Sequence, residues 1–251
     1  LKGIAIASGN DAVVAMAEKV GGSVENFVTM MNEKATELGL SNTHFANPHG
    51  LDADNHYSSA RDMSIMAREL VKHEKILEFT SIYEDYLKKP DGSSTWLVNT
   101  NRLVRFYNGV DGLKTGFTEG AGYCITTTAK RDSMRLISVV MGVETSDKRS
   151  IDSTNLLNFG FNTYQVKSIL KANEILGTVK IIGGKVEQTE VILEKDITDI
   201  SKVTDESKSF THELSLNEVK APVQVGDIIG TVIIKNQNGE IVAEEKVTVK
   251  E

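Results

Sequence analysis

The chain is poor in cysteine and has no excess of basic residues. Cys124 is the only cysteine among 251 residues, so no disulfide can form within the chain. The run 123–126 predicts a buried strand in which Cys124 packs as a small apolar side chain. The net charge of −7 offers no basic surface for a phosphate backbone, which argues against a nucleic-acid partner.

Long apolar runs are missing as well. No segment approaches the ~20 apolar residues of a membrane-spanning helix, and no signal peptide is visible. The chain opens on Leu1-Lys2-Gly3-Ile4, which is already helix-like and has neither a start methionine nor a capping residue. We therefore expect the first residues to lie inside an element that begins upstream.

The apolar periodicity of the first 163 residues predicts helices around a β-hairpin. Residues 1–80 repeat at helical spacing, and Ser23 and Ser59 are the predicted N-caps of two helices. The stretch 94–145 is rich in β-formers, with predicted strands at 124–129 and 136–143. Ser146 is the predicted cap of a further helix. This order is typical of helices packed on an antiparallel sheet.

After about Tyr164 the pattern changes to short β-like runs separated by turns. The predicted strands are 175–182, 186–193, 210–216, 228–234 and 241–249. Asn238-Gly239, between the last two, is a strong hairpin signal. The prediction is an α+β protein with a first domain over 1–163 and a C-terminal β-rich domain over 164–251.

Two tripeptides carry the chemical signal. Ser8-Gly9-Asn10 lies at the junction of two helical segments, and Lys114-Thr115-Gly116 lies just ahead of a predicted strand. A fixed tripeptide arises by chance in roughly 3% of chains of this length. Taken singly, the first is therefore read as a turn and the second as a strand end with a solvated lysine.

In this order, about a hundred residues apart, the tripeptides resemble those of penicillin-binding proteins and serine β-lactamases. Longer stretches narrow the resemblance to the low-molecular-mass D-alanyl-D-alanine carboxypeptidases. These stretches are 7–12, 47–52, 58–62, 110–116, 120–122 and 139–142. The resemblance extends from residue 1 to about residue 161. It implies a truncated penicillin-binding/β-lactamase-like transpeptidase domain followed by a small all-β domain.

The resemblance also implies an activity. The family removes the terminal D-Ala from peptidoglycan stem peptides through an acyl-enzyme on the serine of a Ser-x-x-Lys motif, upstream of Ser-x-Asn. Only seven residues precede Ser8, and none is a serine. The one Ser-x-x-Lys here, Ser168 to Lys171, follows Lys114-Thr115-Gly116 and is interpreted as a coincidence. The chain as given is therefore expected to be inactive.

The catalytic residues implied by the resemblance are Ser8, Asn10 and Lys114. The Ser8 hydroxyl can donate and accept at once, which suits a proton relay to the leaving D-Ala nitrogen. The Asn10 amide can donate to a substrate carbonyl. Lys114 places a cation near the relay and near the terminal carboxylate of the substrate. All of them should meet in one cleft.

The substrate-binding residues implied are Thr115, Gly116, Phe117 and Arg149. Thr115 can bind the carboxylate, and Gly116 leaves the strand edge bare for an extended peptide. The backbone N–H of Phe117 is a candidate oxyanion donor. Arg149 has two interpretations: a second carboxylate anchor, or a solvated residue at a helix start.

The remaining expectations concern ligands, location and rival functions. The histidines have no metal-ligand spacing, so neither a metal nor another cofactor is expected. The partners implied are a stem peptide ending in D-Ala-D-Ala and β-lactam antibiotics. The location implied is the cell envelope outside the cytoplasm. The resemblance is compatible with a membrane anchor outside these residues. The alternatives are a serine β-lactamase-like hydrolase and a non-catalytic peptidoglycan-binding homologue.

Overall fold

A computed structural model describes residues 1–205 and 208–250, which divide into two compact units, Leu1–Phe161 and Asn162–Glu251. The helices of the first unit are α1 (Lys2–Ala5), α2 (Asn10–Gly21), α3 (Val24–Glu37), α4 (Ala60–Leu70), the 3-10 helix η1 (Glu74–Ile76), α5 (Leu77–Thr80), α6 (Leu103–Phe106) and α7 (Ser146–Thr163). Its strands are β1 (Glu84–Lys88), β2 (Ser94–Val98), β3 (Val110–Thr118), β4 (Gly122–Arg131) and β5 (Met134–Val143).

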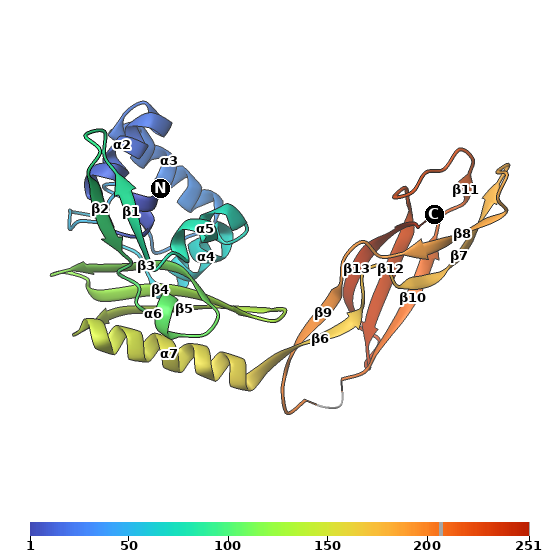
Figure 1. The fold of residues 1–251 in the computed structure, drawn as a ribbon. Helices are drawn as coiled ribbons and strands as arrows, with labels where there is room; N and C mark the ends of the chain where they lie inside the picture. Colours follow the sequence, from blue (N-terminus) through green and yellow to red (C-terminus); the bar gives the residue numbers. More distant parts are fainter. Residues whose placement is uncertain (206–207, 251) are drawn as a thin grey trace. The chain divides into compact units, whose positions relative to one another are not determined.

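An antiparallel sheet in the order β3-β4-β5 is the centre of the first unit. Helices α1 to α5 lie on one face and α7 on the other (Figure 1). The core on the α7 side gathers around Ile125, Ala129 and Leu157, of which Ala129 is fully buried. Strand β3 is the outer strand of this sheet, so one of its edges is free.

The second unit is built from strands. They are β6 (Tyr164–Leu170), β7 (Ile175–Ile182), β8 (Gln188–Ile192), β9 (Ile197–Lys202), β10 (Phe210–Leu216), β11 (Val219–Lys220), β12 (Ile228–Asn236) and β13 (Ile241–Val249). Six form a sheet in the order β10-β12-β13-β8-β7-β11, and β6 pairs with β9. Its core includes the fully buried Val191, Val232 and Val247. The expected all-β second domain is confirmed.

Most of the predicted elements are present. The hydroxyl of Ser23 accepts the N–H of Asn26 at 3.1 Å, and that of Ser59 accepts the N–H of Asp62 at 3.2 Å, so both predicted N-caps are confirmed. The predicted cap of α7 was wrong by one residue. The hydroxyl that accepts the N–H of Lys148 belongs to Thr145, because Ser146 is already the first helical residue.

Two sequence expectations missed structure in the first unit. Residues 38–59 are not helical but form a loop, closed by a β-bridge between His44 and Tyr57. The hairpin β1–β2 was not predicted, because its charged and aromatic residues do not alternate cleanly with apolar ones.

A buried amide network holds the start of β3. Asn101, fully buried, donates to the carbonyl of Gly112 at 3.2 Å and accepts the N–H of Leu103 at 3.1 Å. Asn99 accepts the N–H of Asn101 at 2.9 Å, and the Thr80 hydroxyl donates to the carbonyl of Asp111 at 2.7 Å. These bonds fix the backbone that leads into Lys114-Thr115-Gly116.

Replacing Asn101 with alanine is expected to destabilise the protein by ~2–4 kcal/mol, because the Gly112 carbonyl and the Leu103 N–H lose their partner while buried. For a protein of this size that corresponds to a fall of roughly 10 °C in melting temperature. Thermal unfolding followed by circular dichroism measures it. The matched control is Asn155→Ala on the exposed face of α7, and an equal shift in both variants would contradict the role of the network.

Candidate active site

The free edge of β3 carries the tripeptide Lys114-Thr115-Gly116. On its other side the strand pairs with β4, where Gly116 lies opposite Cys124. A Cβ at Gly116 would meet no atom within 4 Å, so the space beside this residue is open. Phe117 follows with 54% of its surface exposed. An extended ligand can therefore approach the edge closely and pair with it.

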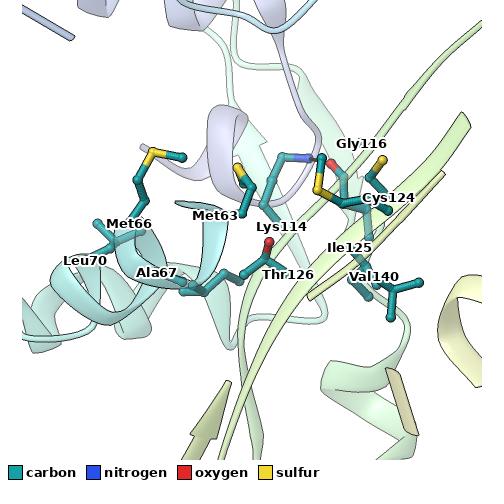
Figure 2. A pocket seen from close by; sticks show the side chains of 13 residues that line it. Met63, Met66, Ala67, Leu70, Lys114, Gly116, Cys124, Ile125, Thr126 and Val140 are labelled. Carbon is teal, nitrogen blue, oxygen red and sulfur yellow. Dashed lines mark hydrogen bonds between the residues drawn. The ribbon is translucent and has the colours of Figure 1, made fainter. Parts of the chain in front are cut away.

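An apolar pocket of about 270 Å³ adjoins this edge. Figure 2 shows Met63 and Met66 of α4 on one side and Ile125 and Val140 of the sheet on the other. The remaining lining residues are Ala67, Leu70, Leu113, Lys114, Thr115, Gly116, Cys124, Thr126 and Met141. Cys124 was expected to pack as a small apolar side chain in a buried strand; it is half-buried and lines this pocket.

Lys114 is the ionisable group most affected by these surroundings. Burial against the apolar pocket disfavours its charged form, and the nearby cation of Arg149 adds repulsion. Together they lower the pKa of Lys114 to about 8. Its ammonium group donates to the carbonyl of Thr115 at 2.8 Å. The lysine is thus partly desolvated and titrates close to neutral pH, which is typical of functional sites.

Thr115 and Arg149 meet at Thr100, a residue that the sequence did not single out. The Thr115 hydroxyl donates to the Thr100 hydroxyl at 2.7 Å. The guanidinium of Arg149 donates to the carbonyl of Gly116 at 3.2 Å and makes a longer contact of 3.5 Å with the carbonyl of Thr100. Arg149 therefore lies against the strand edge and is not free in solvent, while its role as a carboxylate anchor stays a prediction.

The guanidinium of Arg149 is held in place by an aromatic ring. Its central carbon lies 5.6 Å from the ring centre of Tyr123, and that ring packs against Phe117 at 4.3 Å. Burial lowers the pKa of Arg149, while the guanidinium remains charged. Among the residues that the structure describes, the buried Nε of Arg149 has no hydrogen-bond partner.

The segment that carries Ser8 and Asn10 is linked by a backbone hydrogen bond to Thr100, the residue that contacts Thr115 and Arg149. Ser8 has a left-handed backbone, with φ of 58°, and precedes α2, which begins at Asn10. Both side chains are exposed. The carbonyl of Ile6 accepts the N–H of Thr100 at 3.4 Å, which links this segment to the residue that contacts Thr115. Within the described ranges, no hydrogen bond joins Ser8 or Asn10 to Lys114 or Thr115, so the convergence expected of these side chains stays a prediction.

The loop 41–58 borders the end of β3. The carboxylate of Asp52 accepts the N–H of Gly120 at 3.3 Å, in the turn between β3 and β4. The Nδ1 atom of His56 accepts the N–H of Ala46 at 3.0 Å, and Nδ1 of His49 accepts that of Leu51 at 3.3 Å. These hydrogen bonds to ring nitrogens shape the loop.

The loop should weaken in acid, because His56 cannot be protonated at Nδ1 while it accepts the N–H of Ala46. Burial lowers the pKa of His56, and repulsion by His49 and His44 adds to this against the opposing effect of Asp52. A basic group whose folded-state pKa is lowered contributes stability above its unfolded pKa of about 6.5, and this stability is lost as pH falls through the folded-state value.

Melting temperatures measured between pH 7.5 and 5 test this expectation. His56→Asn keeps an acceptor for the Ala46 N–H without a titrating ring, so the decline in acid should be smaller in this variant. His73→Asn, far along the chain on the turn after α4, is the control. Identical pH dependence in the wild type and in His56→Asn would refute the role of His56.

The described part of the chain has neither a candidate metal cluster nor a candidate membrane-spanning helix. Residues 1–205 and 208–250 contain no group of three or more His, Cys, Asp or Glu side chains placed to hold a metal ion. No helix within the same ranges is long and apolar enough to cross a membrane.

Comparison with known proteins matches both units of the chain to one family. A family model described as D-alanyl-D-alanine carboxypeptidase matches residues 1–145, and one described as the penicillin-binding protein 5 C-terminal domain matches residues 164–251. The chain is 48% identical to the D-alanyl-D-alanine carboxypeptidase DacF of Bacillus subtilis, over 100% of the chain and 64% of DacF. It is 36% identical to DacA of Escherichia coli, over 92% of the chain and 57% of DacA. The chain thus spans about three fifths of these relatives.

Solved structures are similar too. Penicillin-binding protein 5 of Haemophilus influenzae superposes with a TM-score of 0.70 at 33% identity, over 100% of the chain and 72% of that protein. Penicillin-binding protein D2 of Listeria monocytogenes, in an ampicillin-bound form, gives 0.57 at 35% identity, over 64% of the chain and 65% of that protein.

Proposed function

Because this chain belongs to the D-alanyl-D-alanine carboxypeptidase family of penicillin-binding proteins, we propose that the protein it comes from is a serine-type carboxypeptidase acting on peptidoglycan stem peptides. The observation that carries the proposal is the β3 edge. Lys114 and Thr115 lie there beside Arg149, which contacts the carbonyl of Gly116. Two cations and a hydroxyl at a free strand edge suit an extended peptide that ends in a carboxylate.

The substrate's carboxylate would lie between Thr115 and Arg149. The Thr115 hydroxyl can turn from Thr100 to the ligand, and the guanidinium of Arg149 lies beside it at the carbonyl of Gly116. Lys114 adds a nearby positive charge. These groups select a terminal carboxylate, so the enzyme would remove a C-terminal residue rather than cut within a chain.

The reaction then follows the family's acyl-enzyme route. The hydroxyl oxygen of the Ser-x-x-Lys serine attacks the carbonyl carbon of the penultimate D-Ala, and the C–N bond to the terminal D-Ala breaks. The hydroxyl proton passes to the leaving nitrogen, with Ser8 as the relay. The backbone N–H of Phe117 stabilises the oxyanion, and Asn10 holds the peptide. Water then hydrolyses the ester and restores the serine.

A location outside the cytoplasm, in the cell envelope, belongs to the same proposal, since peptidoglycan is found there. β-Lactams would be bound at the same edge, because they carry a carboxylate beside a reactive carbonyl. The ampicillin-bound form of the Listeria protein supports this part of the proposal.

The proposal is tested with the full-length protein and a pentapeptide ending in D-Ala-D-Ala. Release of D-Ala, together with a long-lived penicilloyl adduct, is the expected result. Rapid loss of that adduct with little D-Ala release would favour a β-lactamase. Saturable peptide binding with no release of D-Ala would favour a non-catalytic binding protein.

A further inference from the structure

The hairpin β1–β2 presents two large aromatic side chains to solvent. Tyr86 and Trp96 lie directly opposite each other on the two strands, and 63% and 58% of their surfaces are exposed. Because side chains alternate between the faces of a strand, the neighbouring Leu97 points the other way and is buried. Single exposed apolar residues are common on proteins, but a paired Tyr–Trp surface of this kind is typical of a binding site.

The backbone beneath this aromatic pair is firmly held. The N–H of Asn99 donates to the carbonyl of Tyr83 at 2.7 Å, and its side chain donates to the carbonyl of Ile82 at 2.9 Å. An ion pair between Lys2 and Asp85 joins the hairpin to α1. The hairpin rises on the same side of the β3–β5 sheet as the helices α1 to α5 (Figure 1). The backbone that carries the two rings is therefore tied to the rest of the first unit.

The aromatic pair lies within a few residues of the candidate active site along the chain. Strand β2 ends at Val98, and Thr100, two residues later, contacts both Thr115 and Arg149. Trp96 precedes Thr100 by four residues, so their Cα atoms are at most about 14 Å apart. An extended pentapeptide spans about 17 Å by the same measure. A ligand tethered to a stem peptide at the β3 edge can thus reach the aromatic pair.

We propose that Tyr86 and Trp96 form a subsite for the glycan strand from which the stem peptide hangs, a chain of β-1,4-linked N-acetylhexosamines. The choice of this ligand rests on the proposed function. A pyranose ring presents C–H groups on a flat face, and these groups suit the electron-rich face of an aromatic ring. The strands place opposed Cβ atoms about 5 Å apart, which is close to the length of one sugar unit. Exposed Glu84 and Lys88 on the same face carry opposite charges, which suits an uncharged ligand.

The test is a titration of the full-length protein with a soluble hexamer of β-1,4-linked N-acetylglucosamine, which has no stem peptide. Trp96 is the only tryptophan in these 251 residues, so the part of the fluorescence change that is lost in Trp96→Thr reports on this site. A saturable change is expected in the wild type. Tyr86→Thr should weaken the binding by roughly tenfold, and Trp96→Thr should remove the signal. Threonine keeps a strand-forming residue in the hairpin.

Phe159→Ala is the matched control, because Phe159 is 62% exposed on α7 and lies outside the hairpin. Its binding curve should equal that of the wild type, and the melting temperatures of all variants should agree. No response of the wild type to the hexamer, or equal binding by Tyr86→Thr, would overturn the inference. A third outcome would also overturn it: the wild type self-associates, Trp96→Thr abolishes this self-association, and the hexamer causes no response. That outcome would assign the surface to a second copy of the chain. Wild-type release of D-Ala from a free pentapeptide tests the proposed function separately.

Discussion

The 251-residue chain, incubated with penicillin, should carry no covalent adduct, whereas the full-length protein with the family's Ser-x-x-Lys ahead of Ser8 should carry one. Acylation requires a serine whose hydroxyl is activated by a nearby base. Within these residues the only Ser-x-x-Lys is formed by Ser168 and Lys171. Intact-protein mass spectrometry measures the adduct, and the expected contrast is between none and full occupancy.

The structure gives a reason why Ser168 cannot replace that serine. Ser168 lies in strand β6, which ends at Leu170, just before Lys171. On a helix, residues three apart share one face, and this is the placement that a Ser-x-x-Lys motif needs. Ser168 and Lys171 do not lie on a helix, and within the described residues no hydrogen bond joins the two side chains.

Two controls decide how the mass spectra are interpreted. Alanine in place of the upstream serine should abolish the adduct of the full-length protein, and Ser168→Ala should leave it unchanged. A penicilloyl mass shift on the 251-residue chain, localised to any of its serines, would show that acylation does not need the upstream motif.

Replacement of Lys114 by alanine in the full-length protein should lower kcat/KM for a D-Ala-D-Ala pentapeptide by roughly 10³-fold. The substitution removes the cation that the proposed mechanism places beside both the relay and the carboxylate site, and losses of this size are typical of a single electrostatic or proton-transfer group. The matched control is Lys130→Ala, which removes an exposed lysine from the neighbouring strand β4. A loss shared by both variants would point to net charge, and full activity of Lys114→Ala would exclude the proposed role.

The pH profile gives a second measure of the same lysine. Because burial and Arg149 lower the pKa of Lys114 to about 8, its cation is present below that pH and lost above it. We therefore expect kcat/KM to fall as pH rises through about 8. Lys114→Arg keeps its charge to far higher pH, so the falling limb should move upward in that variant. A limb that stays in place would assign the titration to another group.

Much of the fold could be predicted because its signals are local. The strands 175–182, 210–216 and 241–249 match the predicted ranges residue for residue, since each is a short β-rich run bounded by turns. Ser23 and Ser59 were predictable caps, because a cap bonds only a few residues ahead. The hairpin β1–β2 was missed, because its exposed Tyr86 and Trp96 break the alternation that marks a half-buried strand.

The sequence by itself determined the family, the two-domain order and the chemistry-bearing tripeptides, because these depend on which residues occur and in what order. Only the tertiary structure decided how Thr100 and Arg149 relate to the β3 edge, and that Asp52 closes on Gly120. Each of these contacts joins segments far apart in the chain, so no local periodicity encodes it. The packing of α4 beside the sheet likewise decided that Lys114 is desolvated. The charge state of a lysine depends on what surrounds it in three dimensions, and a strand sequence gives only its neighbours along the chain.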